Sequence, residues 1–127
     1  MVEDIELALY ERWDADLLSR PGSEASYPFM PGARVYKVLG KMFALLSEEH
    51  IPLRLNLKGD PIRNQFLCRD YPAITPGYHM NKTHWISVHL DGTVPDELLE
   101  NLIDESYRLV AAGLARAEKI RLAALGG

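Results

Sequence analysis

The segment from Gly77 to Trp85 concentrates side chains that hydrogen-bond, carry charge or stack. It holds two histidines, an asparagine, a lysine and a tryptophan, close to turn-forming stretches at 75–78 and 81–83. Such groups can bind an anion together, and an indole ring offers a stacking surface. One interpretation is therefore an anion site formed by His79, Asn81, Lys82 and His84, with Trp85 as its platform. Alternatively, the polar groups satisfy the turns while Tyr78 and Trp85 fill the core, and the sequence leaves both open.

Polar side chains also alternate with apolar ones along two predicted strands. Leucines form one face of residues 53–58, and the other face carries Arg54, Asn56 and Lys58. In residues 85–90 the corresponding polar face carries Trp85, Ser87 and His89. If the two strands are neighbours, basic groups lie beside an aromatic ring, as in open-sheet nucleic-acid binders. A solvated face without a ligand is the simpler alternative, and we expect the 53–58 strand to be buried on one side only.

The spacing of other reactive residues gives little support for metal binding or catalysis. His79, His84 and His89 are five residues apart, which fits neither a helix face nor one face of a strand. The acids of the first predicted helix are most simply an exposed helix face. No nucleophile–base pair, phosphate-binding glycine loop or paired-carboxylate motif is present, so Ser106 and Cys68 are predicted to be packing residues. We expect no metal and no cofactor, and favour a protein that is not an enzyme.

Periodicity predicts the elements that position these residues. Helices are predicted at 4–19, at 61–71 and from residue 95 to 114, with a helical tail at 115–127 that we expect to project from the domain. In the second helix, Ile62, Phe66 and Leu67 form the predicted apolar stripe. Strands are predicted at 34–39 and 41–47, joined at Gly40 by a tight hairpin, and at 53–58 and 85–90. Residues 23–31 are predicted to be irregular, and a short extended piece is expected between the two turns at 75–83.

The order is thus α-β-β-β-α-β-β-α, which is typical of an α+β two-layer sandwich built on an antiparallel sheet. Its 127 residues, 47% of them hydrophobic, are enough for one domain, with a core at about 5–114. The single cysteine, the acidic N-terminus and the lack of a long apolar run predict a cytoplasmic protein that neither spans nor enters a membrane.

Charge is unevenly distributed along the chain, although the net charge is only −4. Residues 32–90 hold eight bases and four acids, whereas the segments on either side are acidic. All four histidines also lie in this basic middle segment. An anionic partner is therefore expected to contact the middle of the chain.

Several motifs together resemble the MmcQ/YjbR family over about residues 5–114. They are Tyr-Pro-Phe at 27–29, Gly-Lys-Met-Phe-Ala-Leu-Leu at 40–46, Asn-Leu-Lys-Gly-Asp-Pro at 56–61, Tyr-Pro-Ala-Ile-Thr-Pro-Gly-Tyr-His-Met-Asn-Lys-Thr-His-Trp at 71–85, Leu-Asp-Gly-Thr-Val-Pro-Asp-Glu-Leu-Leu at 90–99, and Ser106-Tyr107. The resemblance implies a CyaY-like or secretion-chaperone-like α+β fold and a double-wing DNA-binding arrangement in which hairpins act as wings. Gly59 departs from the family pattern, in which cysteine is common at this position, and the alanine-rich tail departs from it as well.

Three functions follow as hypotheses. The first is a monomeric DNA-binding module that presents its basic middle segment to phosphate. The second is a small-anion or metabolite-binding protein, or an enzyme, with a pocket lined by His79, Lys82, His84 and Trp85. The third is a protein-interaction domain that pairs through the last helix and its tail.

Overall fold

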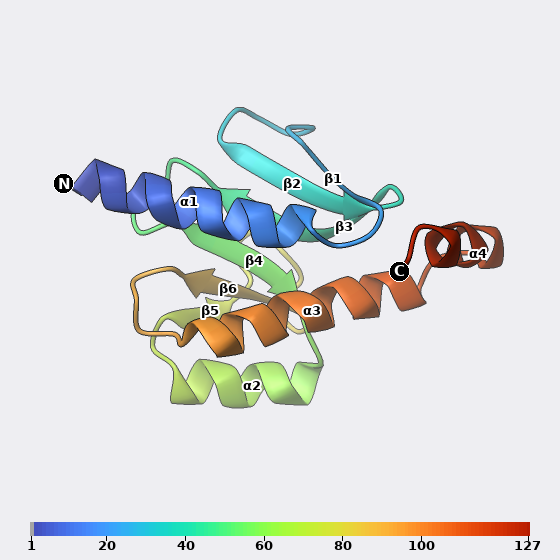
Figure 1. The fold of residues 1–127 in the computed structure, drawn as a ribbon. Helices are drawn as coiled ribbons and strands as arrows, with labels where there is room; N and C mark the ends of the chain where they lie inside the picture. Colours follow the sequence, from blue (N-terminus) through green and yellow to red (C-terminus); the bar gives the residue numbers. More distant parts are fainter. Residues whose placement is uncertain (1) are drawn as a thin grey trace.

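The computed structural model describes residues 2–127 and contains both layers of the predicted sandwich (Figure 1). The elements in chain order are α1 (Val2–Leu18), β1 (Ser23–Ser26), β2 (Ala33–Val38), β3 (Lys41–Ser47), β4 (Arg54–Lys58), α2 (Pro61–Asp70), β5 (Ile74–Pro76), β6 (Trp85–His89), α3 (Asp96–Ala112) and α4 (Arg116–Ala124). The α+β class is confirmed, and the structure adds β1 and a separate α4 to the predicted order. Within residues 2–127, none of the helices has the length and hydrophobicity needed to cross a membrane.

One antiparallel sheet contains all six strands, in the order β1-β2-β3-β4-β6-β5. The β2–β3 connection is the predicted tight hairpin, because Leu39 and Gly40 both have positive φ angles of 45° and 86°. β1 was missed because Ser23–Ser26 has no apolar alternation, and it pairs at the edge of the sheet with β2. The predicted extended piece was placed too late: β5 ends at Pro76, before the turn.

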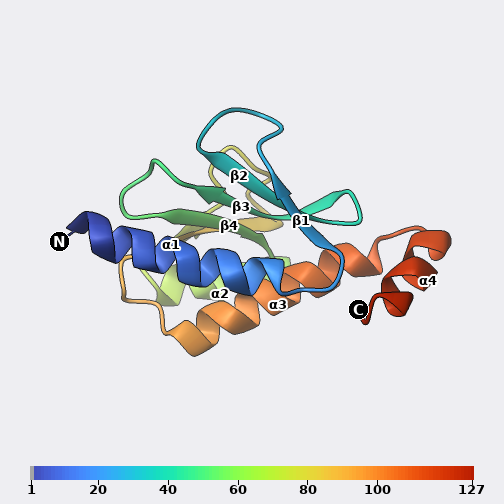
Figure 2. The ribbon, with the colours of Figure 1, turned by 45° about the horizontal axis from the view of Figure 1, so that its top comes forward.

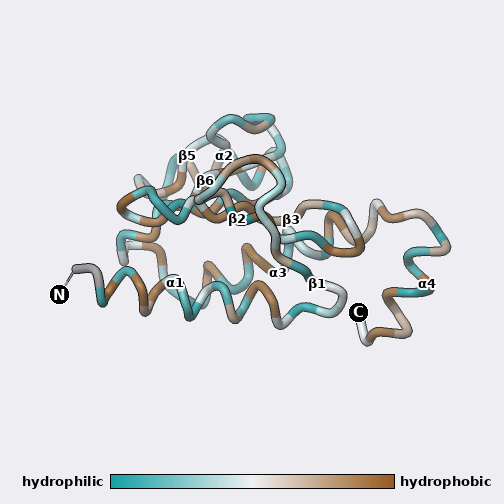
Figure 3. Tube along the Cα trace, turned by 90° about the horizontal axis from the view of Figure 1, so that it is seen from above, coloured by the Kyte–Doolittle hydropathy of each residue, from teal (hydrophilic) through white to brown (hydrophobic). Residues whose placement is uncertain are grey.

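Helices α1, α2 and α3 cover one face of the sheet, called here the inner face (Figures 1 and 2). A single buried cluster joins Trp13 and Leu17 of α1, Leu67 of α2 and Ile103 of α3 to the inward-facing residues of the strands. Seen from above, α1 alternates hydrophilic and hydrophobic stretches along its length (Figure 3). This alternation is typical of a helix with one covered side and one side in solvent.

Two predictions about helices are wrong. Leu67 of α2 is buried as predicted, but Ile62 and Phe66 are 66% and 49% exposed. The helix packs mainly against β5 and β6, and it buries Asn64 beside Leu67. The tail does not simply project: Leu122 of α4 is buried in the main cluster and lies close to Gly22. The predicted start of α2 is confirmed, since Asp60 caps it and Pro61 follows.

Ser106 of α3 connects this helix to an irregularity in the sheet. The β2–β3 register shifts at Tyr36 and Lys37, which leaves Phe43 without a partner in either neighbouring ladder. The hydroxyl of Ser106 donates to the Phe43 carbonyl at 2.6 Å and accepts from the Lys58 backbone amide at 2.8 Å. A fully buried serine therefore satisfies two backbone groups that the sheet leaves unpaired.

Candidate functional site

The uncovered side of the sheet, called here the outer face, brings the two predicted polar strands together. The β4–β6 ladder pairs Arg54 with His89, Asn56 with Ser87, and Lys58 with Trp85. The expectation that these six residues share a surface is therefore confirmed. The outer face also includes Lys37, Met42, Leu45 and Ser47 from β2 and β3.

The centre of this face is buried, contrary to the expectation that β4 has one solvated side. Asn56 is 2% exposed and Ser87 is fully buried, because the segment 77–84, called here the loop, folds over them. The Asn56 amide donates to the Tyr78 carbonyl, the Tyr78 amide donates to the Ser87 hydroxyl at 2.9 Å, and that hydroxyl donates to the Asn56 side-chain oxygen at 2.6 Å. This closed network fixes the start of the loop on the sheet.

Inside the loop, two of the predicted site residues have structural contacts. The Asn81 side-chain oxygen accepts from the backbone amides of Thr83 and His84, as in an Asx turn. The Lys82 ammonium donates to the Gly77 carbonyl at 2.9 Å. His79 and His84 are exposed, and His79 contacts the ring of Tyr78 at a centroid distance of 4.0 Å. The loop thus presents the two imidazoles to solvent while Asn81 and Lys82 also shape its backbone.

Arg54 is a half-buried cation of the outer face. Its guanidinium lies 3.9 Å from the centre of the Tyr78 ring, and Nη2 is 3.4 Å from the Ser47 hydroxyl. Its Nε is buried without a hydrogen-bond partner. Among the residues that the structure describes, no carboxylate forms an ion pair with Arg54. This positive charge is balanced only by a π face and a hydroxyl.

Two histidines lie near Arg54 on the outer face. The rings of His50 and His89 are 5.6 Å apart, and the His89 Nε2 is 3.4 Å from the Thr75 hydroxyl. Burial, and then the nearby His50 and Arg54, lower the pKa of His89 below its usual range. The lowered pKa favours the neutral form of the His89 imidazole.

The structure divides the basic middle segment into two groups. Three arginines form ion pairs with acids: Arg34 with Asp14, Arg63 with Glu105, and Arg69 with Asp70. Within residues 2–127, the other five bases of the segment form no ion pair: Lys37, Lys41, Arg54, Lys58 and Lys82. The unpaired set, rather than the segment's total charge, marks the candidate surface.

Lys37, Lys41 and Lys58 lie at the end of the sheet where the β2–β3 hairpin turns, called here the hairpin end. The register pairs Lys37 with Met42 and Val38 with Lys41, while Lys58 is the last residue of β4 next to Trp85. Glu24 of β1, opposite Lys37, is an acid on this side. Sequence reasoning did not select Lys37 or Lys41, although the hairpin predicted at Gly40 would have placed Lys41 beside the turn.

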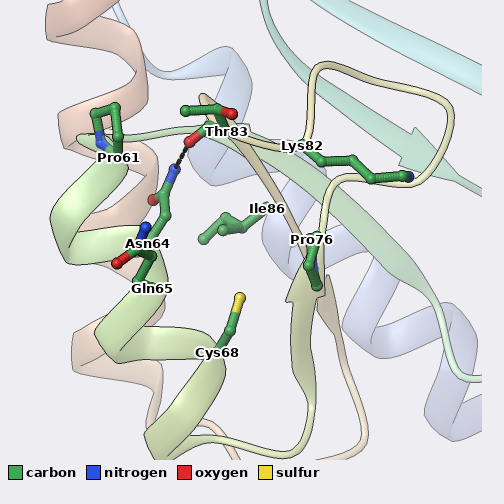
Figure 4. Close-up of a pocket in the computed structure, with 8 residues that line it drawn as sticks. All are labelled: Pro61, Asn64, Gln65, Cys68, Pro76, Lys82, Thr83 and Ile86. Atoms are coloured by element: carbon green, nitrogen blue, oxygen red, sulfur yellow. Dashed lines mark hydrogen bonds between the residues drawn. The ribbon is translucent and has the colours of Figure 1, made fainter.

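A second part of the loop borders a cavity of about 330 Å³ between α2 and the β5–β6 strands (Figure 4). Asn64 closes it on one side: its amide donates to the carbonyls of Gly59 and Thr83. A Cβ atom at position 59 would lie only 2.4 Å from the side-chain oxygen of Asn64. Such a short contact explains why this chain has glycine at that position. Cys68 lines the cavity, and burial raises the pKa of its thiol. Since a higher pKa reduces the thiolate fraction, this cysteine is poorly suited to act as a nucleophile.

Metal-binding side chains do not converge anywhere in the described part of the chain. No group of three or more histidine, cysteine, aspartate or glutamate side chains among residues 2–127 is placed to hold a metal ion. The unpaired cations make the outer face, with its loop and hairpin end, the candidate site.

Comparison with known proteins places the chain among relatives of similar length. YbdF of Escherichia coli O157:H7 is 41% identical over 115 residues, which cover 91% of this chain and 94% of that protein. YjbR of Escherichia coli strain K12 is 33% identical over 105 residues, covering 83% and 88%. These names state no activity.

Solved structures show the same fold. The crystal structure of the Deinococcus radiodurans protein DR2400 has a TM-score of 0.83 and 43% identity, covering 89% of this chain and 86% of that one. A Pseudomonas syringae protein has a TM-score of 0.61 and 27% identity, covering 85% and 97%. The family model described as YjbR matches residues 18–109. The chain therefore belongs to the YjbR family, as its sequence motifs indicated.

Proposed function

We propose that this protein binds nucleic acid, with DNA as the expected partner, through the outer face and its hairpin end. The observation that carries the proposal is the separation of charge between the two layers. Helices α1 and α3 contain eleven of the eighteen acids and only two of the fourteen bases. The negative charge of the chain is thus concentrated on the helical side, away from the outer face.

The cations of the outer face, and Lys41 at the hairpin end beside it, are available to phosphate. Lys41 pairs with Val38 of the buried cluster, so its side chain leaves this end of the sheet on the helical side. Lys41 and Lys82 are exposed and Lys58 is half-buried, and none of the three is neutralised by a described carboxylate. A flexible ammonium group contacts phosphate oxygens without reading the base, so these lysines supply affinity rather than sequence preference. In this proposal, the hairpin carrying Lys41 and the loop carrying Lys82 act as the two wings that the family resemblance implies.

Aromatic side chains on the same side favour unpaired bases. Phe29 and Tyr78 are 67% and 47% exposed, and Phe29 lies in the segment before β2. Exposed rings beside cations are the usual means of binding single strands, because any base can stack on them. We therefore expect the protein to bind single-stranded DNA more tightly than duplex DNA. We further propose that it acts as a monomer in the cytoplasm.

The double variant Lys41→Gln/Lys58→Gln should weaken binding to a labelled single-stranded oligonucleotide by roughly tenfold at low salt. Each lysine that neutralises a phosphate contributes about −0.7 to the slope of log K against log salt concentration for a single strand. The slope should therefore become shallower by about 1.4 in the double variant. Fluorescence anisotropy across a series of salt concentrations measures both quantities.

The matched control is Arg12→Gln/Arg108→Gln, which removes the same amount of charge from the helical side. Both arginines form exposed ion pairs with acids of α3, so their loss should change stability little. This control should bind as the unmodified protein does. Equal losses in the two double variants, or binding no tighter than that of an acidic control protein, would contradict the proposal.

A further inference from the structure

A cavity of about 310 Å³ opens on the outer face, beneath the loop and beside Arg54. Its walls are mainly apolar and include Leu45 and three of the four methionines of the chain, Met30, Met42 and Met80. Phe29 forms part of the rim. Methionine side chains are flexible and polarisable, so such walls adapt to flat or irregular apolar groups.

Arg54 supplies the cavity's formal positive charge. Asn56 also lines it, but both ends of the Asn56 amide already form hydrogen bonds, to Tyr78 and Ser87. The Arg54 guanidinium has only the Ser47 hydroxyl and the Tyr78 ring as partners, and its Nε has none. A half-buried guanidinium without a counter-ion favours an anion, and its planar fork matches a carboxylate.

We propose that this cavity binds a small organic carboxylate, with the carboxylate on Arg54 and an apolar body among Met30, Met42 and Met80. A volume near 310 Å³ is at the small end of the range for ligand pockets, which limits the body to about one or two rings or a short chain. Of the four residues that the sequence suggested for a small-anion pocket, only His79 lines this cavity. The cavity shares Phe29 and Tyr78 with the proposed stacking surface, but it contains none of the lysines of the hairpin end, and carboxylate binding does not depend on nucleic-acid binding.

The test uses 2-naphthoate and its uncharged analogue 2-naphthamide as probes, with methionine methyl groups observed by NMR. Titration with 2-naphthoate should shift the Met30, Met42 and Met80 methyl signals saturably, and 2-naphthamide should bind at least about tenfold more weakly. Arg54→Gln should remove this difference, because it should lower the affinity for 2-naphthoate and leave the affinity for 2-naphthamide unchanged. Lys41→Gln/Lys58→Gln should leave both affinities unchanged, which separates carboxylate binding from the proposed phosphate contacts of these lysines.

A second variant tests the cavity without changing its charge or the sheet. Met80→Trp places a large side chain in the cavity from the loop, and it should abolish binding of both probes. Equal affinities for the two probes, or 2-naphthoate affinity unchanged in Arg54→Gln, would overturn the assignment to Arg54. Unchanged binding in Met80→Trp would overturn the assignment to this cavity.

Discussion

Replacing Leu102 by alanine should lower the free energy of unfolding by about 2 to 4 kcal/mol. Leu102 is 3% exposed and belongs to the cluster that joins α3 to the inner face of the sheet. The variant loses the favourable free energy of transferring the leucine side chain from water to the core. It also leaves a cavity in a closely packed interior. Denaturant unfolding monitored by circular dichroism measures the change.

Leu109→Ala is the matched control, since it makes the same substitution in the same helix at a side chain that is 39% exposed. Its effect should be within about 0.5 kcal/mol. If the two variants lose similar stability, α3 does not dock on the sheet through the face described above.

Ser106→Ala should cost about 1 to 3 kcal/mol, although alanine is the better helix former. The substitution leaves the Phe43 carbonyl and the Lys58 amide buried without partners, at the point where the β2–β3 register shifts. Neither group can turn to water, because Ser106 is fully buried between helix and sheet. The expected result is a clear loss of stability from the removal of one oxygen atom.

Asn101→Ala provides the comparison for Ser106→Ala, because Asn101 is an exposed polar residue of the same helix. That variant should unfold at the same denaturant concentration as the unmodified protein or slightly above it. A Ser106→Ala variant as stable as Asn101→Ala would mean that the two backbone groups find other partners.

Local patterns were sufficient for most of the fold. The long apolar repeat of α3, the glycine of the β2–β3 turn and the Asp60-Pro61 start of α2 each determine their structure through neighbouring residues, so sequence alone predicted them. β1, and the docking of the predicted helical tail as α4, could not be predicted in the same way. The strand Ser23–Ser26 forms because β2 offers it an edge, and α4 is placed by the burial of Leu122.

The candidate site was predicted less completely, because its main features are tertiary. Alternation correctly put Arg54, Asn56 and Lys58 on one face, but it could not show that the loop buries Asn56 and Ser87. Charge counting selected the whole middle segment, yet Arg34, Arg63 and Arg69 are neutralised by partners from elsewhere in the chain or by a neighbour. The strand register brings Lys37 and Lys41 to the hairpin end, and counting charges along the chain does not reveal that register.

The assignment of function to the outer face is tested most directly by mapping where nucleic acid contacts the protein. A ¹⁵N-labelled sample titrated with a single-stranded oligonucleotide at low salt gives the shift of each backbone amide. We expect the largest shifts in the β2–β3 hairpin, in β4 and β6 around Lys58 and Trp85, and in the loop, with α1 and α3 nearly unchanged. Shifts concentrated on α1 and α3, or no saturable shifts at all, would contradict the account.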